Sequence, residues 1–344
     1  MHCSLTHHDP SRREFLKTTL ILGSLMHAGP GKLFASAGTL EGHEATPSLF
    51  YKHKILPVDR LPELRDDFDK LKRSGKLSLN STFQKYIQGM KFTIPDNFKE
   101  AKSIVMMAVF TRFMKVSFHL KGKTHDVIIP PQYYDDGVSP DQLKRLIQTN
   151  IANDPKARIE SAEHLPLKLL AVRSGLGRYG RNNICFVDGM GSYLTLYAFL
   201  TDIPVEEDQW FPVEMMDACK KCKICFGICP TWCISRDRFV IDVDRCITLY
   251  NELEDPFPKW IQPRVHNALI GCMKCQMHCP VNMKIPNPSG RLEDVTEGET
   301  QKILQGTPDD ALMTSLKRKL RDFYPVTSKK TFPMFTRNLS VLIR

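Results

Sequence analysis

The stretch of sequence that decides the fold is DACKKCKICFGICP, residues 217–230. Its cysteines follow the spacing Cys-x2-Cys-x2-Cys-x3-Cys-Pro, which is the run found in bacterial ferredoxins that hold two clusters. Three cysteines at this spacing wrap around one face of an iron–sulfur cube, and the fourth, before Pro230, points to a neighbouring cluster. The run therefore predicts a protein that binds iron–sulfur clusters.

A second half-motif, GCMKCQMHCP at residues 271–280, lacks one cysteine of the full run, and Cys246 can supply it from upstream. Exchange of the two Cys-Pro ligands between the halves then gives two sets of four thiolates, each for one [4Fe–4S] cluster. The first cluster is assigned to Cys219, Cys222, Cys225 and Cys279. The second cluster is assigned to Cys229, Cys246, Cys272 and Cys275.

Other uses of these cysteines fit the sequence less well. Zinc held by four thiolates favours pairs of cysteines far apart in sequence, not a three-cysteine run. Disulfide frameworks are typical of small chains, whereas this one has 344 residues. Of the remaining cysteines, Cys3 lies near the N-terminus, Cys185 is expected to be a buried strand residue, and Cys233 is expected to pack near a cluster.

Residues 1–37 predict a twin-arginine signal peptide. They contain SRREFLK at residues 11–17, a mildly apolar run at 18–28 and the small-residue site Ala35-Ser36-Ala37. A disordered basic tail is the alternative. Because the twin-arginine translocase moves folded proteins, clusters assembled on reduced thiolates in the cytoplasm can travel with their host. We therefore expect export to a periplasmic or membrane-associated location.

The charged residues form no long run of a single sign along the sequence. The net charge is +10, and the four basic and two acidic residues within 1–37 leave +8 for the rest. The charges are scattered, which indicates a solvated surface with some attraction to an acidic redox partner or anionic lipid. No later stretch is long and apolar enough to span a bilayer.

The fold class expected is α+β, with a mixed α/β domain at 58–205 before the cysteines. Apolar periodicity predicts helices at 59–74, 81–90, 142–152 and 166–174, and strands at 103–110, 115–120, 125–129, 184–187 and 193–201. Residues 38–57 are predicted to be a linker, residues 206–286 a double-cluster ferredoxin-like domain, and residues 287–344 a C-terminal extension with a basic helix at 309–323.

Three segments resemble epoxyqueuosine reductase: GLGRYGRN at 175–182, TDIP at 201–204 and GCMKCQ at 271–276. The related corrinoid reductive dehalogenases share much of this pattern. The resemblance implies an N-terminal cobalamin-binding domain of nitroreductase-like fold, joined to the double-cluster domain. It also implies that an electron-donor protein reduces the clusters, which pass single electrons to cobalt for the reduction of a small-molecule substrate.

The same resemblance nominates site residues. The aspartate that donates a proton in epoxyqueuosine reductase matches Glu160 best, and a surface or salt-bridged carboxylate is the alternative. The candidate corrinoid loop consists of Gly175, Gly177, Gly180, Arg181 and Asn182, and a tight turn is the alternative. A dinucleotide fingerprint is not expected there, since that motif follows a strand and opens a helix.

The sequence also departs from the family. Arg178 and Arg181 stand where epoxyqueuosine reductase has an aromatic residue and a lysine. Epoxyqueuosine is a base of tRNA, which an exported enzyme does not meet, so we expect another substrate and no nucleic-acid partner. Two alternatives stay open: a non-catalytic ferredoxin-type electron carrier, and a cytoplasmic epoxyqueuosine (tRNA) reductase with a fortuitous N-terminus. The α/β domain argues against a carrier, which needs no core of that size.

Overall fold

The computed structural model describes residues 37–39, 49–205, 207–236 and 240–343. The twin-arginine signal predicted for residues 1–37 lies, apart from Ala37, outside the described residues. Within those ranges, no helix has the length and apolar character needed to cross a membrane.

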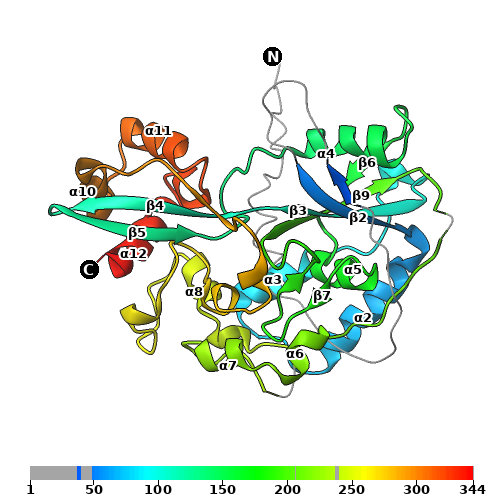
Figure 1. The fold of residues 1–344 in the computed structure, drawn as a ribbon, viewed down its shortest axis with the longest axis horizontal. Coiled ribbons are helices and arrows are strands. Elements are labelled where there is room, and N and C mark those ends of the chain that lie inside the picture. Colours follow the sequence, from blue (N-terminus) through cyan, green and yellow to red (C-terminus); the bar gives the residue numbers. More distant parts are fainter. Residues whose placement is uncertain (1–36, 40–48, 206, 237–239, 344) are drawn as a thin grey trace, which may run out of the picture.

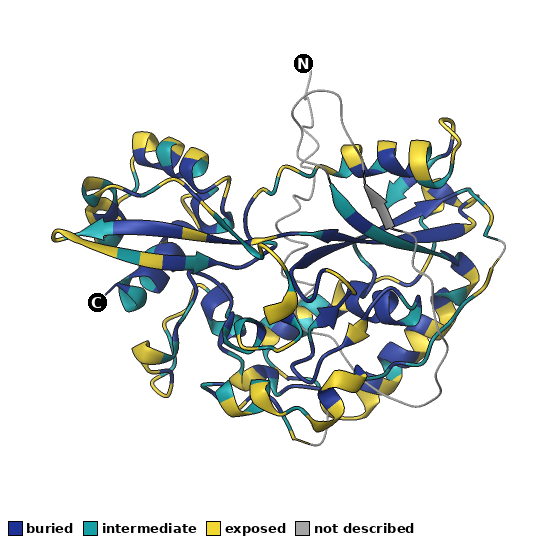
Figure 2. Cartoon of the chain, viewed as in Figure 1, coloured by how far each residue is buried: buried dark blue, intermediate teal, exposed yellow. Residues whose placement is uncertain are grey.

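A five-stranded antiparallel sheet forms the centre of the N-terminal part, in the order β1-β2-β3-β9-β6. Its strands are β1 (Ala37–Thr39), β2 (Phe50–Pro57), β3 (Ser103–Phe110), β6 (Ile159–Ser161) and β9 (Leu194–Thr201). β3 and β9 are apolar along their length, as is typical of strands covered on both faces. Figure 2 shows both as buried.

Helices cover both faces of this sheet. One face is covered by α2 (Leu61–Arg73), α3 (Ser81–Gln88) and α5 (Leu167–Arg173), and the other by α4 (Pro140–Leu146) with the π-helical turn Ile147–Ile151. Because successive side chains of a strand point to opposite faces, β3 contributes side chains to both helical layers. Ile104 and Met106 pack with α2 and α3, whereas Val105 and Met107 pack with Leu143 of α4.

The predicted linker at 38–57 is wrong in its second part. β2 pairs with β3 over seven residues, from Tyr51 opposite Val109 to Pro57 opposite Ser103. Only two of its side chains, Tyr51 and Leu56, are buried, and the charged side chains between them hide the apolar alternation that marks a strand. Residues 40–48 of this linker lie outside the described residues.

A second sheet continues directly from the first. β3 leads through Thr111 and Arg112 into β4 (Phe113–Leu120), which forms the predicted hairpin with β5 (Lys123–Ile129). Figure 1 shows this hairpin reaching away from the central sheet, and Figure 2 shows its tip exposed. β10 (Ser289–Arg291) pairs in parallel with β4.

The C-terminal extension folds onto this hairpin. It contains α10 (Glu297–Gln305), α11 (Asp310–Lys319) and α12 (Phe332–Leu342). The helix α12 was not among the predicted helices, and it places Phe335 in a fully buried cluster with Phe118 of β4, Phe323 and Phe332. These apolar contacts lie far apart in sequence, and no single stretch reveals them.

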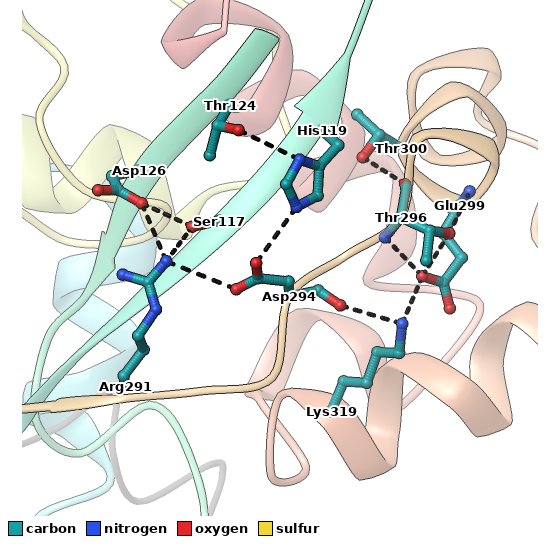
Figure 3. A network of polar contacts seen from close by, with 10 residues as sticks. All are labelled: Ser117, His119, Thr124, Asp126, Arg291, Asp294, Thr296, Glu299, Thr300 and Lys319. Atoms are coloured by element: carbon teal, nitrogen blue, oxygen red, sulfur yellow. Dashed lines mark hydrogen bonds and ion pairs between the residues drawn. The ribbon is translucent and has the colours of Figure 1, made fainter. Parts of the chain in front are cut away.

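Polar contacts join the hairpin to the C-terminal helices, as Figure 3 shows. His119 of β4 contacts Asp294 with 3.2 Å between ring nitrogen and carboxylate. The backbone carbonyl of Asp294 accepts a hydrogen bond from Lys319 at 3.0 Å, and Lys319 also donates to Glu299 at 2.7 Å. Glu299 closes the capping box of α10 with Thr296. Strand, connection and helices thus form one unit.

The cysteine-rich segment contains only short helices. They are α6 (Asp217–Lys221), α7 (Ile224–Ile228), α8 (Ile247–Glu252) and α9 (Lys274–Met277), and the two-stranded ribbon β7 (Arg178–Tyr179) and β8 (Cys185–Phe186) lies next to them. This segment does not have its own core. Ile234, Ile241 and Leu249 belong to the same buried cluster as Leu170 of α5 and Leu196 of β9.

Candidate iron–sulfur site

The first set of predicted ligands lies along the short helices α6 and α7: Cys219 is within α6, Cys222 ends it as its C-cap, and Cys225 is within α7. The pKa of Cys225 is raised to about 12, first by burial and then by the neighbouring thiols of Cys219, Cys222 and Cys279. Cys279 follows α9 and reaches this set from the second half-motif. Neighbouring thiols cannot all ionise without a positive charge among them, and bound iron supplies one.

The second set lines a cavity of about 90 Å³. Cys229, Cys246, Cys272 and Cys275 all contribute to its wall. The pKa of Cys275 is raised, first by burial and then by the thiols of Cys272 and Cys246. Asn267 donates a hydrogen bond to the Cys272 sulfur at 3.1 Å, and this contact opposes the effect of burial on the pKa of Cys272.

The structure places Cys279 near the thiols of the first half-motif and Cys229 near those of the second. Among the described residues, no three cysteine, histidine or acidic side chains are gathered closely enough to hold a single metal ion. A cube of irons and sulfides is a larger body that binds each thiolate at a separate iron, so this donor set fits a cluster.

Cys233 lies beside the second set. Its sulfur is 3.4 Å from that of Cys229, and this contact is the main reason that the pKa of Cys229 is lowered to about 5. Cys233 is 5% exposed and also lines the cavity. It is therefore a further thiol beside the four that are assigned to the second cluster.

Arg181 of the glycine-rich loop holds the first ligand segment in place. Its buried guanidinium donates hydrogen bonds to the backbone carbonyls of Cys219 at 2.7 Å and Cys222 at 2.9 Å, and further bonds to Lys220 and Arg236. The neighbouring Asn182 hydrogen-bonds to Cys275 of the second set. The loop thus contacts both ligand sets.

The glycines of this loop face protein atoms. A Cβ atom at Gly175 would lie 2.6 Å from the Phe211 ring, and one at Gly177 would lie 2.6 Å from the Cys185 sulfur. A Cβ atom at Gly180 would meet the Asn182 side chain at 2.5 Å. The structure therefore gives these glycines a packing role, and the space that they leave is not free for a corrin ring.

Residues 218–282 match the family described as 4Fe-4S double cluster binding domain. Over 114 residues the chain is 40% identical to epoxyqueuosine reductase of Escherichia coli (strain K12), a stretch that covers 33% of this chain and 29% of that protein. With epoxyqueuosine reductase of Bacillus anthracis it is 26% identical over 189 residues, 53% of this chain and 48% of that one.

Over these stretches the chain is similar in sequence to epoxyqueuosine reductases. The structure of epoxyqueuosine reductase from Streptococcus thermophilus aligns with it at a TM-score of 0.59, with 19% identity, over 85% of this chain and 76% of that chain. An α/β domain followed by a double-cluster segment is confirmed as the fold. The matched stretch spans less than a third of the length of the epoxyqueuosine reductases of Escherichia coli, Shigella dysenteriae and Salmonella typhimurium.

Glu160 lies away from both ligand sets. It is on the edge strand β6, its side chain is 39% exposed, and its carboxylate is 3.5 Å from the Arg158 guanidinium. It is not among the residues that line the cavity of the second set. Glu160 therefore lies in a salt bridge with Arg158, which is the alternative that the sequence left open.

Sequence reasoning missed Lys168, which lines the cavity of the second set. Its ammonium donates hydrogen bonds to the backbone and side-chain oxygens of Asn183 at 3.1 and 3.3 Å. Burial lowers its pKa to about 7, and the nearby Cys185 and Cys246 thiols oppose that shift. The signal in the sequence is a lysine inside the apolar helix LKLLAVR, residues 167–173.

Proposed function

We propose that the chain is an iron–sulfur reductase that relays single electrons through two [4Fe–4S] clusters to a substrate at the α/β domain. Cys219, Cys222, Cys225 and Cys279 would hold the first cluster, and Cys229, Cys246, Cys272 and Cys275 the second. The observation that carries this proposal is the pair of thiol sets inside a segment that matches the double-cluster domain. When bound, the clusters supply one-electron transfer.

The residues around the thiols support this role. Arg181 fixes the carbonyls of the first ligand segment, and Asn267 donates to a sulfur of the second set. Hydrogen bonds to sulfur and burial are the means by which a protein sets the potential of a cluster. The Thr231 hydroxyl lies 3.8 Å from the Cys229 sulfur and offers a further donor.

A corrinoid does not fit the loop nominated for it. Gly175, Gly177 and Gly180 face Phe211, Cys185 and Asn182, and Arg181 is occupied by backbone carbonyls. The proposed electron path is therefore written without a corrinoid at this loop, and Glu160 is given no role in it.

Export by the twin-arginine translocase belongs to this proposal. Arg12 and Arg13 within SRREFLK support it, as does the need to assemble clusters on reduced thiols before transport. Substitution of both arginines by lysine should hold the protein in the cytoplasm, as measured by cell fractionation. An unchanged distribution would instead favour the cytoplasmic tRNA-acting alternative, and conversion of an epoxyqueuosine-containing tRNA stem loop would be its assay.

Iron analysis of anaerobically purified protein tests the cluster proposal. We expect about eight irons per chain for the wild type and about four for Cys229→Ala. Cys233→Ala is the matched control, since Cys233 lies 3.4 Å from Cys229 but is outside the set of eight, and it should keep about eight irons. A colourless wild-type protein with about two zinc ions would overturn the proposal.

A further inference from the structure

A buried lysine reaches the cavity of the second thiol set without an acidic partner. Lys168 is the second residue of α5 and is 5% exposed. Its ammonium is held by two oxygens of Asn183, both uncharged, at 3.1 and 3.3 Å. In the part of the chain that the structure describes, no carboxylate forms an ion pair with Lys168.

Burial of such a cation needs a source of negative charge nearby. An isolated buried ammonium is strongly unfavourable, so buried charges are normally paired. The cavity wall next to Lys168 supplies the thiols of Cys229, Cys246, Cys272 and Cys275. When iron binds, these thiols become thiolates, and the cluster with its four thiolates carries a net negative charge that grows on reduction.

We propose that Lys168 is the counter-charge of the second cluster and raises its reduction potential. A fixed cation in a low-dielectric cavity stabilises the more negative, reduced form more than the oxidised form. Lys168 would then make the second cluster easier to reduce than it would be without this charge. This inference rests on the cluster binding of the proposed function.

The alternative is a purely structural role, in which Lys168 only holds the turn at Asn183 through hydrogen bonds. Asn183 has a left-handed backbone with φ of 63°, which needs support from its surroundings. Lys168→Gln separates the two roles, since the amide can still donate to Asn183 but carries no charge. The control is Lys223→Gln, which removes the same charge from an exposed site between Cys222 and Cys225, where water and salt screen it.

The measurement is a redox titration of the holoprotein, followed by electron paramagnetic resonance, with iron content determined on the same samples. At unchanged iron content, the potential of one cluster should shift to a more negative value in Lys168→Gln and stay at the wild-type value in Lys223→Gln. An unchanged potential in Lys168→Gln overturns the proposal. Wild-type protein without clusters would instead refute the proposed function.

If Lys168→Gln loses the second cluster, Lys168→Arg decides between the two roles. Arginine keeps the positive charge, so retention of about eight irons would show that assembly needs the charge. Loss of the cluster in both variants would overturn the counter-charge role.

A separate observation points to where electrons enter. A groove of about 680 Å³ lies against the segment after Cys229, and Trp232 and Trp260 on its wall are 60% and 46% exposed. Three cations, Arg245, Arg264 and Lys274, line it with one anion, Asp244. Three residues are shared between its wall and that of the thiol cavity, and they are Pro230, Thr231 and Lys274.

We infer that this groove docks an acidic electron-donor protein. Exposed tryptophans at the centre of a polar surface are typical anchors of protein interfaces, and the excess of cations complements an acidic partner. A donor bound there would be separated from the second thiol set by a single layer of residues. This inference, too, rests on cluster binding.

Reduction of the holoprotein by a reduced plant-type [2Fe–2S] ferredoxin, an acidic protein, tests the groove in stopped-flow experiments. Arg264→Glu should slow cluster reduction about tenfold at low salt, with the difference fading at high salt. Lys317→Glu, a change at a half-buried position of α11 outside the groove, is the matched control and should keep the wild-type rate. Equal rates for the two variants would overturn the proposed docking at the groove. Reduction by dithionite, a small reductant that needs no docking surface, checks that both variants hold intact clusters.

Discussion

At the scale of single residues, the clusters depend on side chains that reach across long stretches of sequence. Arg181 is 4% exposed, and it binds carbonyls that lie 38 and 41 residues further along the chain, at Cys219 and Cys222. A guanidinium is suited to this task because its five N–H donors form a fixed fork. Without it, the carbonyls of the first ligand segment lose a partner, and that of Cys219 is buried.

Arg181→Met should therefore cost about 1–3 kcal/mol of unfolding free energy for each carbonyl left unpaired. Its iron content should fall from about eight to about four, because the first ligand segment loses its anchor. Arg178→Met is the matched control, since that side chain is 57% exposed and only contacts Asp217 across 3.7 Å. Iron analysis and thermal unfolding check both, and equal iron contents would contradict the anchoring role.

Arg181 and Asn182 were nominated as part of a corrinoid loop, whereas in the structure they contact the ligand segments. Resemblance singled out Arg181 and Asn182, but their partners could not be read from spacing, since contacts over 38 residues leave no periodic signal. Spacing predicted the double-cluster segment, because the geometry of a cluster imposes a short local pattern of cysteines. Lys168 was missed, since a lysine in an apolar helix shows that something is buried without showing what it faces.

At the scale of elements, local pattern was a good guide wherever apolar residues recur with a regular period. The strand predicted at 103–110 is β3 with the same bounds, and the hairpin around Gly122 is present. β2 and α12 were missed for different reasons. Charged residues mask the alternation of β2, and α12 is stabilised by contacts with β4 that the local sequence does not contain.

Substitution of Phe335 in α12 tests how much the C-terminal extension contributes to the stability of the fold. Its ring is fully buried and contacts Phe118, Phe323 and Phe332 with centroid distances of 6.2, 5.9 and 5.7 Å. Phe335→Ala should lower the free energy of unfolding by about 3–5 kcal/mol. Phe335→Leu should cost much less, and denaturant unfolding distinguishes them. A negligible loss for alanine would mean that α12 is not part of the folded core.

The ion pair between α10 and α11 makes this unit sensitive to acid. Burial alone would raise the pKa of Glu299, but hydrogen bonds from Lys319, Ser315 and Thr296 outweigh it and lower the pKa to about 2. A lowered pKa stabilises the fold above the ordinary carboxyl value of 4.5, and this contribution disappears as the pH falls from 4.5 towards 2.

Glu299→Gln should therefore be less stable than the wild type at neutral pH, and the difference should shrink below pH 4.5. Lys319→Met removes the cation of the same pair and should show the same narrowing. Denaturant unfolding between pH 7 and pH 3 measures the differences. A constant difference for both variants over this range would contradict the assigned contacts.

At the scale of the whole molecule, the double-cluster segment and the α/β domain share a core. Cys229 and Ile241 are buried in the same cluster as Leu170 and Leu196. A buried polar network adds to this union, since Asn282 accepts a hydrogen bond from the Ser192 backbone at 2.9 Å and donates to the Ser192 hydroxyl at 2.7 Å. The domain boundary expected near residue 205 therefore separates stretches of sequence, not cooperative units.

Removal of iron should consequently destabilise the α/β domain as well as the ligand loops. Metal binding contributes directly to folding free energy when the ligands are not preformed in the unfolded chain. After anaerobic chelation, we expect a single unfolding transition at a lower temperature, seen alike by far-ultraviolet circular dichroism and by tryptophan fluorescence from Trp210, Trp232 and Trp260. Because Trp210 contacts Arg173 of α5 while the other two flank the groove, the fluorescence reports on both regions. Two separate transitions, with the α/β part unchanged by chelation, would show that the shared core does not couple the clusters to the rest of the fold.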